Sequence, residues 1–430
     1  MKILSIGGVQ LLAGFREAGH TVRAFIRSAD CSHPDDVPCD FYSDPAESRS
    51  RIAGAINEFN PEVLFQGDHS GPLIHVGLEM FSLPKLWYAV DAHLHEWYRH
   101  YAPVFDTVFC AQQNRVGELS SFHTDVRWLP LYCSREVEPL GWEDRDLNVS
   151  FVGKIDSRFN AGRERLFSEL DSLGIRVHTA TGDWAPVYRR SKVVINDAVQ
   201  DDLNLRFFEA PGAGALLITD ELSHSIAEIL VPGEDCLIYR HGDAASCAEQ
   251  VRWALSHEQE AAAIAVRAHR KITGAHLERH RAAVVLERMR ELAGNGSAAS
   301  GLTCAHLGRA ADMIAQLDLP EKLAVYFRMF ACECADRAMA LGDDSIYRLV
   351  VTAAGAVERE AYCEAAGTLD RCSTFAGDVP LEKRIVHLRL LAEAGSGQVQ
   401  RARRTAEAAA EKFHDDPEIA AALRYFSTLR

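Results

Sequence analysis

A helical pattern is followed directly by the pattern of a buried strand in the segment Asn204-Leu-Arg206-Phe-Phe-Glu209-Ala-Pro-Gly-Ala-Gly-Ala-Leu-Leu-Ile-Thr-Asp220. The segment predicts a helix over Phe207–Ala213 that runs directly into a buried strand over Ala215–Thr219. Its glycines allow the helix and the strand to pack closely while the backbone stays accessible. A helix joined in this way to a buried strand is typical of α/β folds.

The same alternation of apolar strands and helical segments continues on both sides of this segment. It lapses once, in a polar stretch around residues 133–147, and then restarts. We therefore predict an α/β fold with two Rossmann-like domains, residues 1–135 and 136–293, and a ligand cleft near the carboxyl ends of their strands. The further strand candidates are Val63–Gln66, Lys85–Val90, Thr107–Cys110, Val126–Leu129, Val149–Val152, Ile175–Ala180, Val193–Asn196 and Asp235–Tyr239.

The first residues have some features of a short secretion signal, since Met1-Lys2 precedes the uncharged run Ile3–Phe15. Gly7-Gly8 and Gln10 interrupt that run, and no small-residue cleavage site follows it. The pattern instead predicts strand, glycine turn, helix and strand, which is the opening of a βαβ unit. Gly8 would let the backbone approach a ligand, and the helix amides there favour an anion.

The last part of the chain changes in composition after Met289. Residues 294–301 predict a flexible linker, because they are rich in glycine and serine. Residues 302–430 predict an all-α domain, with turn signals at 342–344, 377–380 and 415–417. That spacing is near the period of tetratricopeptide-like (TPR-like) repeats, and an irregular helical bundle is the alternative.

Composition excludes several classes of protein. The 430 residues include 46 basic and 61 acidic ones, a net charge of −15, which argues against a nucleic-acid partner. No apolar stretch is long enough for a transmembrane segment. The 11 cysteines have no framework spacing, so we expect reduced thiols and a cytoplasmic location.

Two segments of the second domain carry residue types that bind a nucleoside diphosphate. Gly153 and Lys154 form a turn at the end of a strand, and Arg158 follows shortly after it. Cations and helix-start amides bind diphosphates, which suits Lys154, Arg158 and Arg206. A ribose needs a fixed carboxylate that accepts two hydroxyl hydrogen bonds, a role suited to Glu209.

These segments resemble the donor half of GT-B glycosyltransferases, most closely the CgeB-like branch of the glycosyl transferases group 1 family. The resemblance is strong over residues 147–290, weaker over 1–135 and absent from 302–430. It rests on the Gly153-Lys154 turn, Asn204-x-Arg-x-x-Glu-Ala with the strand that follows, Pro232-Gly-Glu-Asp and Ala275–Arg281.

The resemblance implies a metal-independent hexosyltransferase that uses a nucleoside-diphosphate sugar as its substrate and needs no cofactor. By position, Glu209 would hold the ribose, Arg206 and Lys154 would face the diphosphate, and other residues would line the base side. The expected donor-binding residues are Gly8, Gly153, Lys154, Arg158, Thr181, Tyr188, Asn196, Asn204, Arg206 and Glu209.

One position departs from the pattern of retaining enzymes, which pair that Glu with another acid eight positions earlier. Here that position is Asp201, beside Asp202. Because aspartate is shorter, the stereochemical course stays open.

The first domain is expected to supply the acceptor site and a catalytic group. Two loops follow strand candidates: one holds Asp68 and His69, the other Asp91 and His93. Such a residue at a strand end acts as a base or contacts the transferred sugar. We expect His93 in this role, with Asp91, Asp68 and His69 as alternates, alongside Lys154 and Arg206 at the leaving group.

Two rival interpretations use the same chain. Asp91, His93 and His95 alternate and would share one face of an extended segment as a metal half-site, and with His69 they would suit a metallohydrolase. Alternatively, the chain is a non-catalytic nucleotide-sugar-binding adaptor whose helical repeats recruit a partner. If it is an enzyme, residues 302–430 offer a surface for a protein acceptor or partner, and a surface glycan is another possible acceptor.

Overall fold

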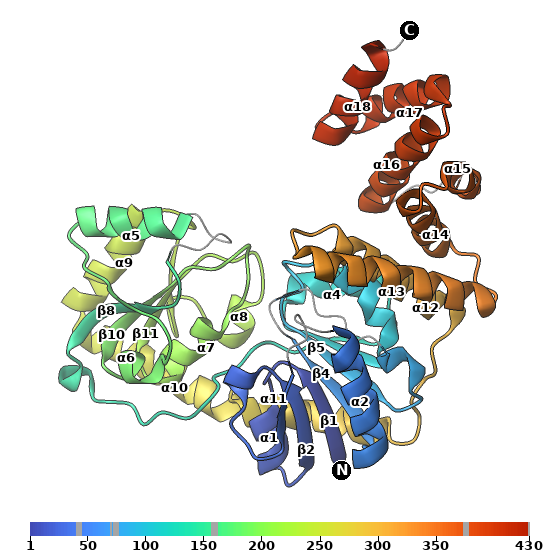
Figure 1. The fold of residues 1–430 in the computed structure, drawn as a ribbon. Coiled ribbons are helices and arrows are strands. Elements are labelled where there is room, and N and C mark those ends of the chain that lie inside the picture. Colours follow the sequence, from blue (N-terminus) through green and yellow to red (C-terminus); the bar gives the residue numbers. More distant parts are fainter. Residues whose placement is uncertain (40–44, 69–70, 72–76, 156–161, 373–377, 429–430) are drawn as a thin grey trace.

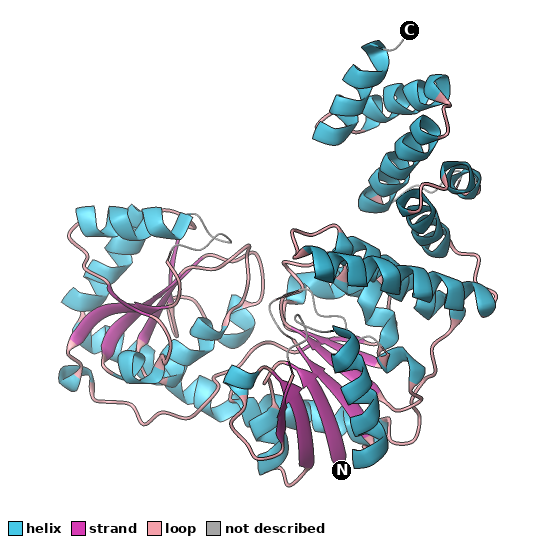
Figure 2. Ribbon diagram, in the orientation of Figure 1, coloured by secondary structure: helices cyan, strands magenta, loops and turns pink. Residues whose placement is uncertain are grey.

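The computed structural model describes residues 1–39, 45–68, 71, 77–155, 162–372 and 378–428. Two parallel sheets with helices packed against them are followed by a row of helices that leads to the carboxyl terminus (Figure 1). Among the residues described, every strand lies in the first two parts of the chain and the last part is helical (Figure 2). The predicted α/β class with an all-α region after it is confirmed.

The first sheet has seven parallel strands in the order β3-β2-β1-β4-β5-β6-β7. The chain moves outward from β1 to β3 and then returns to the other side of β1. The order therefore reverses between β1 and β4, and open α/β sheets bind ligands at such a point. Its elements are β1 (Lys2–Gly7), α1 (Leu12–Glu17), β2 (Thr21–Ile26), β3 (Asp36–Pro38), α2 (Pro45–Phe59), β4 (Val63–Gly67), β5 (Lys85–Ala89), α3 (Tyr98–Tyr101), β6 (Thr107–Cys110), α4 (Gln113–Ser120) and β7 (Val126–Trp128).

The second sheet has five parallel strands in the order β12-β11-β10-β8-β9, and it reverses between β8 and β10. The predicted helix and strand around residues 207–219 correspond to α7 and β11, and β11 is buried along its whole length. The elements are β8 (Leu147–Val152), α5 (Gly162–Ser172), β9 (His178–Ala180), α6 (Ala185–Arg189), β10 (Ser191–Asn196), α7 (Leu205–Gly212), β11 (Leu216–Asp220), α8 (Ile226–Ile229), β12 (Leu237–Tyr239) and α9 (Ala244–Ser256).

Two helices carry the chain back from the second sheet to the first. α10 (Glu258–Ala275) packs on α7 and β11, whereas α11 (Glu278–Glu291) packs on α1 (Figure 1). A Cβ on Gly14 of α1 would lie 2.6 Å from the Cβ of Ala282, so the two helices touch through small residues. The side chain of Arg281 adds hydrogen bonds to the carbonyls of Pro130 and Leu131.

The segment predicted to be a flexible linker is packed against the first domain, so that prediction is wrong. A Cβ on Gly296 would lie 2.2 Å from the carbonyl carbon of Leu83. The carbonyl of Ser297 accepts from Nζ of Lys85 (2.7 Å), and its amide donates to Asp106 (3.0 Å). Here glycine serves close backbone approach rather than freedom of motion.

The remaining helices form a row in which each packs on the next. The first two also enter the core of the first domain, where Leu307 and Phe327 share a cluster with Trp97 and Tyr101. Of the predicted turn signals, 342–344 lies between two helices, 377–380 leads from Gly377, outside the described residues, into α16, and 415–417 leads into α18. Each interval between the signals holds two helices. The helices are α12 (Gly301–Ala315), α13 (Glu321–Ala340), α14 (Ile346–Glu358), α15 (Tyr362–Asp370), α16 (Val379–Gly395), α17 (Val399–Lys412) and α18 (Pro417–Thr428).

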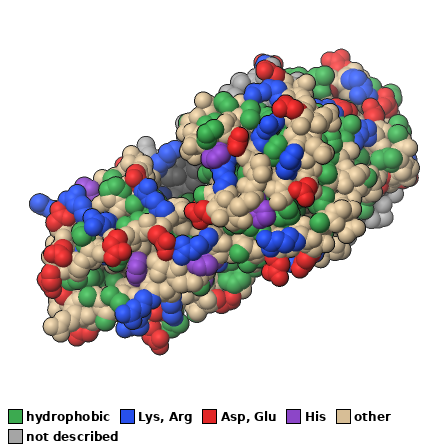
Figure 3. All heavy atoms as spheres, turned by 90° about the horizontal axis from the view of Figure 1, so that it is seen from below, with side chains coloured by type: hydrophobic (Ala, Val, Ile, Leu, Met, Phe, Trp, Pro, Cys, Tyr) green, Lys and Arg blue, Asp and Glu red, His purple; other side chains and the backbone are tan. Residues whose placement is uncertain are grey.

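Among the described residues, no helix is long and apolar enough to cross a membrane. On the face drawn in Figure 3, acidic and basic side chains are interspersed.

Candidate functional site

The turn after β8 is built around a glycine. Gly153 has a φ of 150°, and its amide donates to the carbonyl of Ala180 over 2.9 Å. A Cβ on this residue would lie 2.7 Å from Nη2 of Arg206. Glycine therefore leaves the space that the guanidinium group occupies.

Arg206 is held at the end of β8 by neutral partners. Its guanidinium carbon lies 4.0 Å from the ring centroid of Phe151. Nη1 donates to Oδ1 of Asn196 (2.7 Å), and Nη2 donates to the carbonyl of Val152 (3.0 Å). Within the described part of the chain, no carboxylate forms an ion pair with it, so its positive charge is fixed in place and available to an anion.

Glu209 lies behind this arginine on α7 and is only 8% exposed. Burial raises its pKa to about 7, against the opposing effects of Arg206, a hydrogen bond with Ser134, and Arg135. The helix begins at Asn204, whose side chain accepts from the amide of Phe207 (3.4 Å). Glu209 is thus an acid whose charge changes near neutral pH.

A second arginine shapes the same turn, although its role was not predicted. The side chain of Arg163 pairs with Asp197 (3.0 Å) and donates to the carbonyl of Lys154 (3.0 Å). It thereby ties the turn after β8 to the end of β10. Lys154 itself is exposed, and Arg158 lies outside the described residues.

The three residues expected on the base side differ in exposure. Thr181 is exposed, next to Gly182 with its φ of 91°. Tyr188 is fully buried, and its hydroxyl accepts from the amide of Val152 (3.2 Å). Asn196 is also fully buried between Arg206 and Thr219. In this structure Tyr188 and Asn196 therefore support the turn from behind.

The glycine turn after β1 is closed by the chain itself. A Cβ on Gly8 would lie 1.9 Å from the carbonyl oxygen of Asp68. The amide of Gly14, in the first turn of α1, donates to Oε1 of Glu278 from α11 (3.2 Å). Burial raises the pKa of Glu278 to about 7. The amides that the sequence offered to an anion thus face a carboxyl group of the same chain.

Asp68 organises the loop after β5. Its Oδ2 accepts from the amides of Val90 (2.6 Å) and Asp91 (2.8 Å), and its Oδ1 accepts from the hydroxyl of Tyr98 (2.7 Å). Asp68 is 5% exposed, and both of its oxygens have partners. This makes it a positioning residue for the loop that carries His93. His69 lies outside the described residues.

His93 is 8% exposed, and burial lowers its pKa to about 4, with the nearby charges of Arg115, His95 and His224 adding to the effect. Its buried Nδ1 has no hydrogen-bond partner among the described residues. Burial also lowers the pKa of His95. His93 is therefore neutral at physiological pH, and because His224 belongs to the second domain, the loop that carries His93 lies on the side of the first domain that faces the second.

Residues at the start of α4 bridge the two domains. Nε2 of Gln113 donates to Glu228 (2.8 Å), and its Oε1 accepts from Ser225 (2.7 Å). Oε1 of Gln112 accepts from the amide of Leu203 (2.9 Å). Sequence reasoning missed these contacts. The signal that points to them is a run of amide side chains directly after a buried strand.

Asp201 takes part in the same bridge. Its Oδ1 accepts from the amide of Ser223 (2.8 Å), and its Oδ2 accepts from Asn114 of the first domain (3.3 Å). Its carbonyl interacts with Nε2 of His224 (2.9 Å). The carboxylate of Asp201, eight positions before Glu209, is thus used to hold loops together.

One group in the described part of the chain has metal-binding residue types in reach of one another: Asp197, Asp220 and His241, whose ligand atoms lie within 4.8 Å. Asp197 is already paired with Arg163, and Asp220 accepts from the amide of Ala198 and interacts with His241 (2.7 Å). Asp91, His93 and His95 do not form such a group by themselves, and His69, the fourth residue of the metallohydrolase alternative, lies outside the described residues.

Comparison with known proteins identifies part of the chain. Residues 136–287 match the family model described as glycosyl transferase-like. Among curated proteins, none matches the chain. The matched segment is the second domain, with the Gly153 turn and Arg206.

Solved structures share the architecture of the two sheets. Sucrose-phosphate synthase from Thermosynechococcus elongatus is 13% identical, with a TM-score of 0.51 over 68% of this chain and 99% of that one. HepE from Anabaena, in complex with UDP-glucose, is 12% identical, with a TM-score of 0.52 over 68% of this chain and all of that one. The two α/β domains therefore have the GT-B fold.

Proposed function

We propose that this chain is a glycosyltransferase that moves a sugar from a nucleoside-diphosphate sugar to an acceptor. The observation that carries the proposal is the fixed, unpaired Arg206 beside Gly153, within the segment that matches the glycosyl transferase-like model. The GT-B fold supports it, since the cleft lies at the carboxyl ends of both sheets.

In this proposal Arg206 and Lys154 stabilise the charge that develops on the departing diphosphate. A cation held in advance lowers the barrier because it needs no reorganisation during the reaction. Arg163 contributes indirectly, since it holds the carbonyl of Lys154. Glu209, buried behind Arg206, would accept the ribose hydroxyls in its charged form.

His93 is the proposed contact of the first domain with the transferred sugar. With a pKa of about 4 it is neutral, so it offers a lone pair or a neutral N–H rather than a positive charge. Asp68 and Tyr98 hold its loop. Asp91 is the alternate, and the anomeric configuration of the product distinguishes retention from inversion at the sugar.

UDP-sugars are the first donors to test, because HepE was solved with UDP-glucose. We expect one UDP-sugar to release UDP in the presence of acceptor extract, and the anomeric configuration of the product to be read by NMR. Arg206→Ala should slow the release by a factor of about 100 to 1,000, whereas Arg190→Ala, which changes an exposed residue paired with Asp146, should not. Donor binding without any turnover would favour the adaptor alternative.

We also propose that the reaction needs no metal and no cofactor, because Arg206 and Lys154 supply the positive charge at the diphosphate. Turnover should survive treatment with EDTA. The cytoplasm is the proposed location, supported by eleven free cysteines of which eight are buried.

The helices after residue 301 are proposed to be TPR-like and to hold a protein acceptor or partner. A cavity of about 840 Å³ between α13 and α14 supports this, with Met329 at its edge 69% exposed. Deleting residues 302–430 is a poor test, since α12 and α13 belong to the core of the first domain. Met329→Glu should instead raise KM for a protein acceptor, while Val284→Glu on α11 should not.

A further inference from the structure

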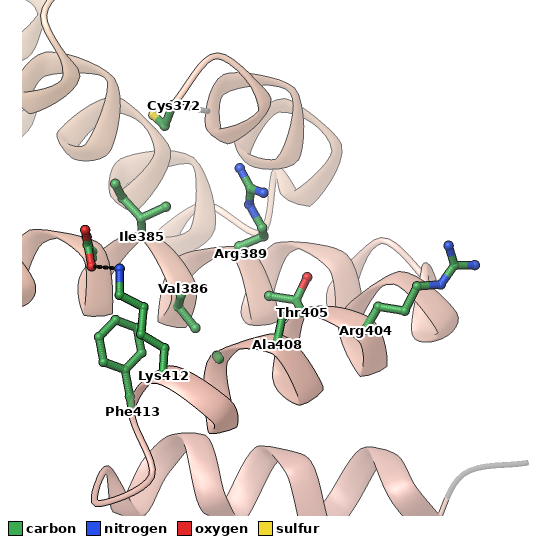
Figure 4. A pocket seen from close by; sticks show the side chains of 11 residues that line it. Cys372, Ile385, Val386, Arg389, Arg404, Thr405, Ala408, Lys412 and Phe413 are labelled. Carbon is green, nitrogen blue, oxygen red and sulfur yellow. Dashed lines mark hydrogen bonds and ion pairs between the residues drawn. The ribbon is translucent and has the colours of Figure 1, made fainter. Parts of the chain in front are cut away.

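A second cavity, of about 440 Å³, lies between α16 and α17 (Figure 4). Its apolar part consists of Ile385, Val386 and Phe413 together with small residues of α17. Arg389, Arg404 and Lys412 lie around this apolar part, and Glu382 is the one carboxylate among the described residues that line it. The cavity is therefore apolar inside and positive at its edge.

The positive charge is uncompensated at two of these residues. Between residues 345 and 428, the described arginines Arg348, Arg359, Arg371, Arg384, Arg401 and Arg403 each form an ion pair with a carboxylate. Arg389, Arg404 and Arg424 form none among the described residues. Two of these three arginines line the cavity.

The three cations that line the cavity differ in their contacts. Lys412 pairs with Glu382, so its charge is balanced. Nη2 of Arg389 donates to the carbonyl of Leu369 (2.6 Å), and its Nε is buried without a partner in the described part of the chain. Arg404 is exposed. An anion bound here would contact the guanidinium of Arg389, which is already oriented, and the exposed guanidinium of Arg404, which is free to move toward it.

We propose that this cavity binds an acidic peptide segment of a partner protein, with carboxylates next to an apolar side chain. The carboxylates would pair with Arg389 and Arg404, while the apolar side chain would contact Val386 and Phe413. An inorganic anion would satisfy only the arginines and would leave the apolar surface exposed to water. The site is separate from the proposed transfer site, so the inference does not rest on glycosyl transfer.

The test is a fluorescence anisotropy titration of the full-length protein with a short fluorescein-labelled peptide in which glutamates flank a central leucine. We expect saturable binding that weakens as salt is added. Arg389→Gln combined with Arg404→Gln should weaken binding by about tenfold or more, because two charge-assisted contacts are lost. Arg424→Gln, which changes an arginine that is also unpaired but lies outside the cavity, should leave binding unchanged.

Two further peptides test whether the protein recognises the carboxylates, the apolar side chain or both. Replacing the glutamates by glutamines should abolish binding, and replacing the leucine by serine should weaken it. The proposal is overturned if the neutral peptide binds as well as the acidic one, if the double variant binds like wild type, or if no binding occurs at about millimolar peptide. Competition by inorganic phosphate as strong as that by the peptide would instead show a simple anion site. Circular dichroism of each variant verifies that the fold is intact.

Discussion

The two sheets begin in the same way, and the turns after their first strands differ in charge. After β1, Gly8 packs against the backbone of Asp68, and the amides at the start of α1 face the carboxyl of Glu278. After β8, Gly153 makes room for the guanidinium of Arg206, which pairs with no described carboxylate. The amides at the first turn therefore have a partner within the chain, whereas the second turn presents a positive charge that no described carboxylate balances.

This difference shows that a glycine turn does not by itself define an anion site. The function of each turn depends on the group that occupies the space beside its glycine. This group is backbone at Gly8 and the guanidinium of Arg206 at Gly153. We therefore expect changes at the first turn to alter stability and changes at the second to alter donor binding.

The largest effect is expected from removal of the cation at the second turn. Arg206→Ala should lower kcat/KM by a factor of about 100 to 1,000, as for other preorganised charge-stabilising groups. Thermal unfolding of the variant should stay close to that of wild type. A variant that keeps full activity would contradict the role of this turn in donor binding.

Replacing each glycine by alanine distinguishes the structural role of the first turn from the binding role of the second. Gly8→Ala should destabilise the protein by about 3 kcal/mol, because the new Cβ would lie 1.9 Å from a backbone oxygen that cannot move away. Gly153→Ala should also cost stability, because its φ of 150° is one that residues with a Cβ rarely adopt, but it should in addition weaken UDP binding by displacing Arg206. Urea unfolding and UDP titration of both variants measure the two effects. The comparison fails if both variants lose only stability.

Neutralising the carboxyl at the first turn should change how stability depends on pH. The pKa of Glu278 rises from 4.5 to about 7 on folding, so the folded state favours its protonated form. Its contribution is complete below pH 4.5 and is lost as the pH rises to 7, a loss on the order of 3 kcal/mol. Glu278→Gln should lack this decrease in urea unfolding. Glu287→Gln, exposed on the same helix, should retain it.

The features that could be predicted from the sequence are those formed by residues close together in the chain. The α7–β11 corner, the Gly153 turn and the motif that carries both Arg206 and Glu209 lie in segments whose patterns can be recognised one at a time. Glu278 against α1, and α12 in the core of the first domain, depend on contacts across more than 200 residues. No spacing within the sequence indicates those, because the return of α11 to the first sheet is a property of the whole topology.

The smallest expected effect is a pH dependence of donor binding that belongs to the second turn alone. Because the pKa of Glu209 is about 7, the fraction able to accept two ribose hydroxyls rises between pH 6 and 8, and UDP affinity should rise by up to about tenfold. The terminal phosphate of UDP also titrates near pH 6, so 2′,3′-dideoxy-UDP serves as the matched ligand. The increase should be present with UDP and absent with the dideoxy compound, and Glu209→Gln should remove the difference between the two. An equal increase with both ligands would assign the pH dependence to the phosphate and leave Glu209 without a role at the ribose.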